Sequence, residues 1–564
     1  MFPLEQLNGL NVAITRLVTD SRAVRQGDTF VAYPGEKTDG RQFIAQAIAR
    51  GANAVIYEKL LSGHPYEAQH FSWDAAWQVP HLAVSGLRHK AGWLAGAVYG
   101  APSEKLQVIG VTGTNGKTST CHWIARALND AGKKCALIGT LGNGFADNLQ
   151  PSANTTPDAI SVQGLLADYL RAGAQAVAME VSSHALAQGR VHGVRFDVAL
   201  LTNLSRDHLD YHGDMESYTA SKRKLFDWQE LKFAVINFDD AFGAELAEQL
   251  QDGIPLPNPL PRAGEGANEA LRAISIPEVI GYGLSDAALQ LAERLGLRMV
   301  YGNLAQMSGQ GLRLNVHASW GAAATRYCEA ADCGSSRLAP PPAPDACAYR
   351  VGGAAQINSA LVGRFNAANL LGALAVLLVS GIGLDEAAQS LSRVQAVAGR
   401  MQRVSGTGQS GDIAQPTVIV DYAHTPDALE KVLLALHEVG ASSGGKLICV
   451  FGCGGDRDCG KRAMMGRVAE KFSDHCIVTS DNPRSEDPQH IIAEILGGMA
   501  ANNHEIIVER AAAIGRAIGL ARQHDTVLLA GKGHEDYQEI AGMKYPFSDV
   551  AVAEGALRTW RAPA

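Results

Sequence analysis

The stretch VIGVTGTNGKTST, residues 108–120, decides the fold of this chain. A short apolar run leads into a glycine-rich loop, which ends in Lys117 and Thr118 at the start of a helix-like segment. Glycines let backbone amides converge on an anion, the lysine adds a cation, and the threonine offers a hydroxyl to magnesium. The stretch predicts a phosphate-binding loop, although Val111 replaces the first glycine of the GxxxxGK[ST] spacing.

We expect the loop to bind nucleotide phosphates, but the loop does not say which chemistry follows, because motors, switches, kinases and ligases share it. The residues expected at the nucleotide are Gly113, Thr114, Asn115, Gly116, Lys117, Thr118 and Ser119.

Short β-branched runs alternate with helix-like segments from residue 105 onward, which is the pattern of a doubly wound, mostly parallel sheet. Thr156-Pro157-Asp158 predicts a helix start, with an N-cap followed by proline at the first helical position, and Gly173 predicts its end. A second alternating series follows residue 399. In the first hundred residues, VTDSRAVRQGDTFVAYPG predicts two short strands joined by a Gly-Asp turn.

The 564 residues therefore predict an α/β protein of three domains: a small N-terminal α/β domain, a central doubly wound ATPase-like domain and a C-terminal Rossmann-like domain. The expected limits are 1–100, 101–398 and 399–564. Two proline-rich stretches, near 255–270 and 333–348, predict surface inserts without chemistry.

Composition excludes several classes of protein. A net charge of -8 gives no overall attraction to nucleic acid, and no apolar run is long enough to cross a membrane. The N-terminus lacks the pattern of a secretory signal, and nine scattered cysteines favour reduced thiols over disulfides. Cys449, Cys453 and Cys459 are spaced too irregularly to favour a zinc site. We expect a cytoplasmic protein without nucleic-acid partners or membrane insertion.

Acidic and imidazole groups follow two later apolar runs. Glu180 ends AVAME, and His208 lies in LLTNLSRDHLDYHGD after the next run. Because carboxyl ends of parallel strands meet at one edge of a sheet, both side chains are candidate magnesium ligands near the loop.

GTNGKTS, MEVSSHAL, TNLSRDHLDYH, FNAANLLGA, GRMQRV and DYAHTPDAL occur in this order, and together they resemble the Mur ligases of bacterial peptidoglycan synthesis. The resemblance implies that ATP phosphorylates a substrate carboxylate and that an amine then attacks the acyl phosphate. It also implies Mg²⁺ and a lysine carbamylated by CO₂, for which the spacing from Tyr218 selects Lys222 over Lys224. The implied catalytic residues are Lys117, Glu180, His208 and Lys222, and the implied metal ligands are Thr118, Glu180, His208 and Lys222 as N6-carboxylysine.

The C-terminal motifs GCGGDRDCGKR, DNPR and GKGHEDYQ resemble those of family members that add the third residue of the stem peptide. DNPR is the form that this resemblance links to meso-diaminopimelate, whose distal carboxylate suits a bidentate guanidinium. The residues implied at the amino acid are Arg457, Asp481, Asn482, Pro483, Arg484, Gly531 and Glu535.

The implied second substrate is UDP-MurNAc-L-Ala-D-Glu. The residues implied at this substrate are Ser21, Asn154, Thr155, Thr156, Ser182, Gln188 and Arg190, with contacts in EKTDGR, Glu36–Arg41, left open. Arg400 and His424 are implied as further ATP contacts. We expect a monomer.

Three alternatives stay open at this point: the same reaction with L-lysine, a folylpolyglutamate-synthetase-like ligase, and a P-loop switch or motor. TDSR, GCGGDRD and DNPR argue against the synthetase. A switch should hydrolyse ATP without the two other substrates, whereas a ligase should not.

Overall fold

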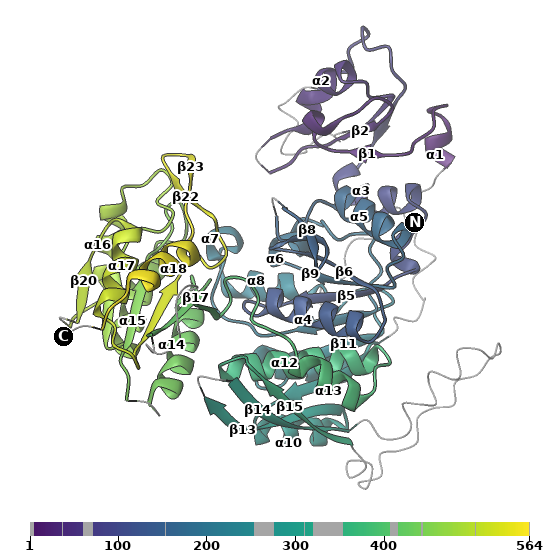
Figure 1. The fold of residues 1–564 in the computed structure, drawn as a ribbon. Helices are drawn as coiled ribbons and strands as arrows, with labels where there is room; N and C mark the ends of the chain where they lie inside the picture. Colours follow the sequence, from purple (N-terminus) through teal and green to yellow (C-terminus); the bar gives the residue numbers. More distant parts are fainter. Residues whose placement is uncertain are drawn as a thin grey trace.

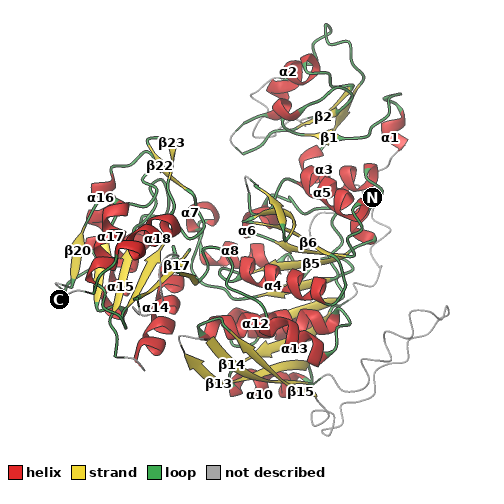
Figure 2. Ribbon diagram, in the orientation of Figure 1, coloured by secondary structure: helices red, strands yellow, loops and turns green. Residues whose placement is uncertain are grey.

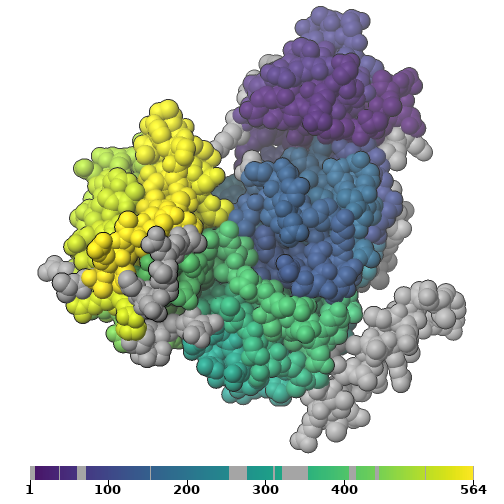
Figure 3. Space-filling view, in the orientation of Figure 1, coloured from purple at the N-terminus to yellow at the C-terminus, as the bar shows by residue number. Residues whose placement is uncertain are grey.

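The computed structural model describes residues 5–36, 38–59, 71–152, 154–252, 276–308, 311–319, 353–405, 415–441, 444–501 and 503–562. These residues form three α/β parts in chain order, and the first and last contact the central one (Figure 1). The space-filling view shows a deep indentation between the N-terminal and C-terminal parts (Figure 3). The predicted three-domain α/β fold is confirmed, and both predicted inserts lie outside the described residues.

The N-terminal domain holds a four-stranded parallel sheet in the order β1-β2-β3-β4. Its elements are α1 (Glu5–Asn8), β1 (Leu17–Val18), η1 (Ser21–Ala23), β2 (Thr29–Ala32), η2 (Gly40–Phe43), α2 (Ile44–Ala49), β3 (Ala54–Glu58), β4 (His81–Val84) and α3 (Leu87–Val98). Both predicted strands and the turn at Gly27-Asp28 are present, and the Asp28 amide donates to the Arg25 carbonyl at 3.1 Å, but this turn does not join the two strands directly. Because β1 and β2 are parallel, the chain must cross back between them, and it does so through η1 and the loop that follows.

The central domain is built on an eleven-stranded sheet in the order β15-β14-β13-β12-β11-β10-β5-β9-β6-β7-β8. Its strands are β5 (Gln107–Thr112), β6 (Cys135–Gly139), β7 (Gly142–Phe145), β8 (Asn148–Gln150), β9 (Ala176–Glu180), β10 (Val198–Leu201), β11 (Phe233–Asn237), β12 (Glu278–Gly283), β13 (Arg298–Ser308), β14 (Gly311–Ala318) and β15 (Gly353–Ser359). The strands from β13 to β6 in this order are parallel, and antiparallel strands extend both edges.

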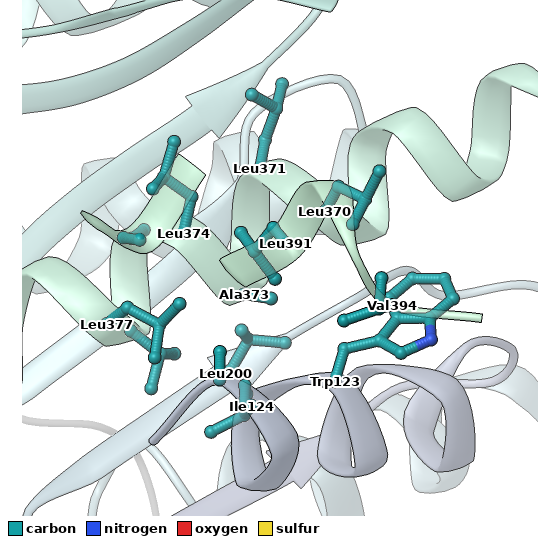
Figure 4. Packing of buried hydrophobic residues seen from close by; sticks show 14 of the residues in the cluster. Trp123, Ile124, Leu200, Leu370, Leu371, Ala373, Leu374, Leu377, Leu391 and Val394 are labelled. Atoms are coloured by element: carbon teal, nitrogen blue, oxygen red, sulfur yellow. The ribbon is translucent and has the colours of Figure 1, made fainter. Parts of the chain in front are cut away.

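Helices cover both faces of the central sheet. They are η3 (Pro102–Glu104), α4 (Lys117–Asp130), α5 (Ala159–Arg171), α6 (Ser183–Ala187), α7 (Leu209–His212), α8 (Met215–Arg223), α9 (Ala241–Gln251), α10 (Asp286–Leu295), α12 (Arg364–Val379) and α13 (Leu384–Ser392). On one face α12 is apolar all round, as expected of a helix enclosed by other elements. Its leucines pack against Trp123 and Ile124 of α4 (Figure 4), and α5, α9 and α10 cover the other face.

The start of α5 differs from the prediction. Asp158, not Thr156, is the N-cap, and its carboxylate accepts hydrogen bonds from the backbone amides of Ile160 and Ser161. A carboxylate at the N-cap can accept hydrogen bonds from the first free amides of a helix, as a hydroxyl can. The Thr156 hydroxyl instead donates to the carbonyl of Glu180 at 2.7 Å.

The C-terminal domain has a six-stranded sheet in the order β16-β17-β21-β18-β19-β20, parallel except for β16. Its elements are β16 (Gln402–Val404), β17 (Thr417–Asp421), α14 (Pro426–Ala441), β18 (Leu447–Phe451), α15 (Gly460–Phe472), β19 (His475–Val478), α16 (Pro488–Leu496), β20 (His504–Ile506), α17 (Arg510–Leu520), β21 (Thr526–Ala530), the hairpin β22 (Tyr537–Ile540) and β23 (Met543–Pro546), and α18 (Asp549–Thr559). Helices pack on both faces (Figure 2). Among the described residues, no helix is long and apolar enough to cross a membrane.

The N-terminal and central domains share a tight junction. Ile160 of α5 belongs to the same buried cluster as Leu87 and Leu94 of α3. A Cβ atom on Gly92 of α3 would lie 1.8 Å from the carbonyl oxygen of His192 in the central domain. Only a residue without a side chain allows this approach.

We expect Gly92→Ala to lower the free energy of unfolding by about 1–3 kcal/mol, because α3 must move away from the His192 carbonyl. Gly96→Ala in the same helix is the matched control, since a Cβ there would lie 3.6 Å from Gln163, an ordinary contact. The control should be neutral or more stable by up to about 1 kcal/mol. Thermal unfolding of both variants measures the difference, and equal midpoints would contradict the role of the close approach.

Candidate active site

The phosphate-binding loop lies at the carboxyl edge of three neighbouring strands. β5 pairs with β10 on one side and β9 on the other, so the segments that follow all three strands meet. A Cβ atom on Gly113, whose φ is 143°, would lie 1.9 Å from Thr202 Oγ1. Asn203 holds the loop further: its Oδ1 accepts from the Asn115 amide and its Nδ2 donates to the Asn115 carbonyl, both at 3.0 Å.

Two lysines converge on this loop. Lys117 Nζ donates to the carbonyls of Gly113 and Thr114, and Lys222 Nζ, from α8, donates to the same Gly113 carbonyl, all at 2.8 Å. Burial, followed by the repulsion of Lys117, holds the pKa of Lys222 well below its ordinary value. Burial also lowers the pKa of Lys117, and Glu180 and Asp207 oppose that shift. Lys222 is therefore suited to carry a neutral amine.

Glu180 is buried and held from two sides. Its Oε2 accepts from Thr118 Oγ1 at 2.9 Å and from Thr140 Oγ1 at 3.1 Å, and its Oε1 accepts from the Thr140 amide at 2.7 Å. The carboxylate and the Thr118 hydroxyl are adjacent oxygen donors beside the phosphate loop, which is the donor chemistry that magnesium prefers. These two predicted ligands fit the metal that the sequence implies.

His208 lies apart from that pair, in a cluster of rings. Its Nε2 is 3.3 Å from Asp207 Oδ2, and its ring lies 4.8 Å from that of His184. Burial lowers the pKa of His208 to about 3, which leaves a neutral ring at neutral pH. Within the described ranges, no group of three or more His, Cys, Asp or Glu side chains is arranged as a complete metal site. A metal here would complete its shell with hydroxyl, substrate or carbamate oxygens.

The C-terminal domain reaches the loop through two segments. Arg400 Nη2 lies 3.5 Å from Thr118 Oγ1, and His424 Nε2 lies 4.0 Å from Asp207 Oδ2. Asp427, in the first turn of α14, accepts through Oδ2 from Asn115 Nδ2 at 3.1 Å and from Ser205 Oγ at 2.9 Å. The residues predicted to contact ATP from this domain thus lie beside the loop.

The residues predicted at the UDP substrate are mostly joined in one network. Arg190 donates to Gln188 Oε1 at 2.7 Å and to the Thr156 carbonyl at 3.0 Å. Ser182 caps α6 beside Thr156. The remaining members are placed as follows: Thr155 bonds Thr140 at 3.1 Å, Asn154 is exposed nearby, and Ser21 is buried in the N-terminal domain, where it donates to Gln46.

The EKTDGR stretch, left open by the sequence, also meets this network. Glu36 Oε1 accepts from the Tyr211 hydroxyl at 2.8 Å and lies 3.5 Å from Arg88 Nη2. Tyr211 in turn accepts from Gln188 Nε2 at 3.2 Å. Glu36 therefore joins the N-terminal domain to the predicted substrate residues of the central domain.

The residues predicted at the amino acid surround the carboxyl edge of the C-terminal sheet. Asn482 Nδ2 donates to Glu535 Oε2 at 2.7 Å, and Asp481 lies so close to Gly531 that a Cβ there would be 2.8 Å from Asp481 Oδ2. Arg457 is exposed, with Nη1 4.0 Å from Asp210 Oδ2 of the central domain. Pro483 is buried between Asn482 and Arg484.

Arg484 has a strained backbone and a partly free side chain. Its φ is 52°, a conformation that costs a non-glycine residue about 1–3 kcal/mol and that clusters at functional sites. Hydrogen bonds from its amide to the Glu539 carbonyl, at 3.0 Å, and from the Ala541 amide to its own carbonyl, at 2.7 Å, hold it there. The guanidinium donates to the Gly455 carbonyl at 2.6 Å and lies 3.4 Å from Glu539 Oε2.

Sequence reasoning missed five residues that hold this site together: Thr140, Asn203, Asp207, Asp427 and Lys532. Asn203, Asp207, Asp427 and Lys532 lie inside motifs that the sequence analysis quotes, so their position was a usable signal. The motifs do not report which partner each one bonds, because Asn203 and Asp427 bond a loop that lies about ninety to three hundred residues earlier.

Comparison with known proteins agrees with this arrangement. Three family models match in chain order: the Mur ligase family catalytic domain over residues 13–99, the Mur ligase middle domain over 111–254, and the Mur ligase glutamate ligase domain over 399–533. A protein of Chromobacterium violaceum is 47% identical over 98% of this chain and 96% of its own length. The chain belongs to the Mur ligase family.

The names of the Chromobacterium protein and of three further proteins show what this Mur ligase is similar to. The Chromobacterium protein is named UDP-N-acetylmuramoyl-L-alanyl-D-glutamate–2,6-diaminopimelate ligase, and so is a protein of Neisseria meningitidis that is 41% identical over 98% of this chain and 96% of its own. A solved structure of the same name is 33% identical, with a TM-score of 0.59 over 96% of this chain and 94% of its own. The MurF ligase of Thermotoga maritima in complex with ADP shares the fold at 16% identity, with a TM-score of 0.56 over 97% and 96% of the chains.

Acid should destabilise this Mur ligase partly through His424. Burial, with help from Lys461, lowers the pKa of His424 to about 4 from its ordinary 6.5. The unfolded chain therefore binds the proton first, and stability present above about pH 6.5 is lost as the pH falls toward 4. We expect thermal unfolding midpoints to fall less between pH 7 and pH 5 in His424→Gln than in the unsubstituted protein.

His437→Gln, at an exposed position of α14, is the control, and its midpoint should fall as much as that of the unsubstituted protein. Identical pH profiles for all three proteins would contradict the expectation.

Proposed function

We propose that this chain is an ATP-dependent ligase that joins meso-diaminopimelate to the D-glutamate of UDP-MurNAc-L-Ala-D-Glu, forming the UDP-MurNAc-tripeptide used in peptidoglycan synthesis. The observation that carries the proposal is the agreement of two features: relatives of that name match nearly the whole chain at 41% to 47% identity, and the DNPR segment brings Arg484 and Asn482 to the residues predicted at the amino acid. We further propose a cytoplasmic monomer.

The proposed reaction has two steps. The substrate carboxylate attacks the γ-phosphorus of ATP, forming an acyl phosphate and releasing ADP. The amine of the second substrate then attacks the acyl carbon, phosphate leaves, and the amine loses a proton as the amide forms. Lys117 is the group that would neutralise the transferring phosphoryl oxygens, since its present acceptors are only the carbonyls of its own loop.

Magnesium, when bound, would supply charge neutralisation at the nucleotide phosphates. Thr118 and Glu180 would hold it, with His208 and a carbamate on Lys222 as further proposed ligands. Thr140 fixes the carboxylate of Glu180 through two hydrogen bonds, so its orientation does not depend on the metal. Arg400 and His424 are proposed nucleotide contacts from the C-terminal domain.

Lys222 suits carbamylation because CO₂ adds only to an unprotonated amine. The amine nitrogen bonds the carbon of CO₂, a proton leaves, and an anionic carbamate results. The depressed pKa of Lys222 supplies the unprotonated form. The modification would also place an anion beside the ammonium of Lys117, an attraction that favours both charged forms.

Lysine as the amino acid is the second candidate, because diaminopimelate differs from it only by a distal carboxylate. The position of Arg484 favours diaminopimelate, since its guanidinium would gain a bidentate carboxylate partner that lysine does not bring. A simpler assay distinguishes a ligase from a switch or motor. Phosphate release from ATP that requires both UDP-MurNAc-L-Ala-D-Glu and the amino acid supports a ligase.

Lys222→Ala should reduce amide formation to near background, because the proposed carbamate is lost. Adding formate or acetate should restore part of the activity, since a free carboxylate can occupy the same position. Lys224→Ala is the matched control on the same turn of the chain, and it should remain active. Phosphate release with all three substrates measures these rates. If Lys224→Ala is the inactive variant, the assignment to Lys222 is wrong.

Arg484→Ala should raise the Michaelis constant for diaminopimelate far more than that for ATP. Loss of one partner of a desolvated charge pair costs about 2–5 kcal/mol, or at least about thirtyfold. The ratio of kcat/KM for diaminopimelate to that for lysine should therefore fall. Phosphate release with a panel of amino acids gives this ratio, and Arg516→Ala, which removes an exposed ion pair with Glu505, is the control. An unsubstituted protein that prefers lysine would overturn the proposed specificity.

A further inference from the structure

Lys532, in GKGHEDYQ, is a fully buried lysine in contact with Asp481, Asn482 and Glu535. Its side chain has 0% exposure. Nζ lies 3.0 Å from Asn482 Oδ1, 3.3 Å from Glu535 Oε2 and 3.4 Å from Asp481 Oδ1. A buried ammonium is stable only when its donors are paired, and these three oxygens match its three N–H groups. It therefore has no donor left for a ligand.

The contacts of Lys532 determine how its neighbours face. Asn482 Oδ1 accepts from Lys532 and, at 2.9 Å, from the Glu539 amide, so the NH₂ group of Asn482 must point toward Glu535. Glu535 uses Oε2 for both Asn482 and Lys532. Glu535 Oε1 accepts no side-chain hydrogen bond from any residue that the structure describes. That oxygen is therefore open to a ligand.

The formal charges point to the same conclusion. Asp481 and Glu535 carry two negative charges, and the ammonium of Lys532 cancels one of them. The cluster of Asp481, Asn482, Lys532 and Glu535 is left with one negative charge, which matches the single distal ammonium of a diamino acid. Arg484 lies two residues after Asn482, and its guanidinium is suited to the distal carboxylate.

We propose that Lys532 is a positioning residue for amino-acid specificity: it orients Asn482 and Glu535 and sets the net charge of the cluster, without touching the substrate. The inference rests on the proposed function, because that function supplies the diamino acid. A purely structural lysine would hold the domain together but would not affect one substrate more than the others.

The test uses the full chain and phosphate release with all three substrates. Lys532→Met should raise the Michaelis constant for diaminopimelate about tenfold or more, the effect of losing an outer partner of a ligand-binding group. The Michaelis constants for ATP and UDP-MurNAc-L-Ala-D-Glu should stay within about twofold, and the preference for diaminopimelate over lysine should narrow. Lys544→Met is the matched control, because Lys544 contacts the ring of Tyr537 at 3.8 Å from an exposed hairpin position, outside the cluster.

A double-variant cycle tests whether Lys532 acts through Glu535. If it does, Lys532→Met should add little to the effect of Glu535→Gln on the Michaelis constant for diaminopimelate. Lys532→Gln, which keeps two N–H donors, should give a smaller increase than Lys532→Met, and it carries the test if Lys532→Met does not fold.

Equal increases for all three substrates, or an unchanged preference with only a lower unfolding midpoint, would overturn the inference and leave a structural lysine. Absence of diaminopimelate-dependent phosphate release in the unsubstituted protein would instead overturn the proposed function. The two failures are therefore distinguishable.

Discussion

The carbonyl oxygen of Gly113 accepts hydrogen bonds from two lysines, and the organisation of the nucleotide site depends on this shared acceptor. Two ammonium groups on one buried oxygen disfavour each other's charge, and the pKa of both lysines is lowered. Burial and the repulsion of Lys117 lower the pKa of Lys222 well below its ordinary value, which favours its unprotonated form. Through Lys222, α8 is bonded directly to the phosphate loop.

The rest of the site is distributed over all three domains. The central domain supplies the phosphate loop and Glu180, the C-terminal domain approaches through Arg400, His424 and Asp427, and the N-terminal domain contacts Tyr211 through Glu36. These contacts are polar, and apolar side chains also join the central and C-terminal domains, because Val362 and Phe365 pack against the C-terminal core cluster. The junction between α3 and α5 is apolar.

Much of the fold could be predicted because its signals are local. Buried parallel strands are recognisable in the sequence as apolar runs, and the phosphate-binding groups of the loop come from consecutive residues. The Gly-Asp turn of the N-terminal domain does not join the two strands directly, because pairing direction depends on where the chain returns, which residues 17–32 alone do not encode. The sequence predicts Thr156 as a helix N-cap because hydroxyls often cap helices. The hydrogen-bond partner of its hydroxyl is instead the Glu180 carbonyl, 24 residues away in sequence. Site residues such as Lys222 were identified through resemblance, and their roles stay predictions.

The close approach of Gly92 to His192 also bears on substrate length. It brings α3 of the N-terminal domain directly against the central domain, and a rigid junction there would keep the span from Ser21 to the phosphate loop constant. A ligand anchored at Ser21 by its nucleotide end would present its carboxylate to the γ-phosphate only if it had the right number of residues. The junction would then select substrates by length. A peptide one residue too short or too long would be rejected whatever its side chains are.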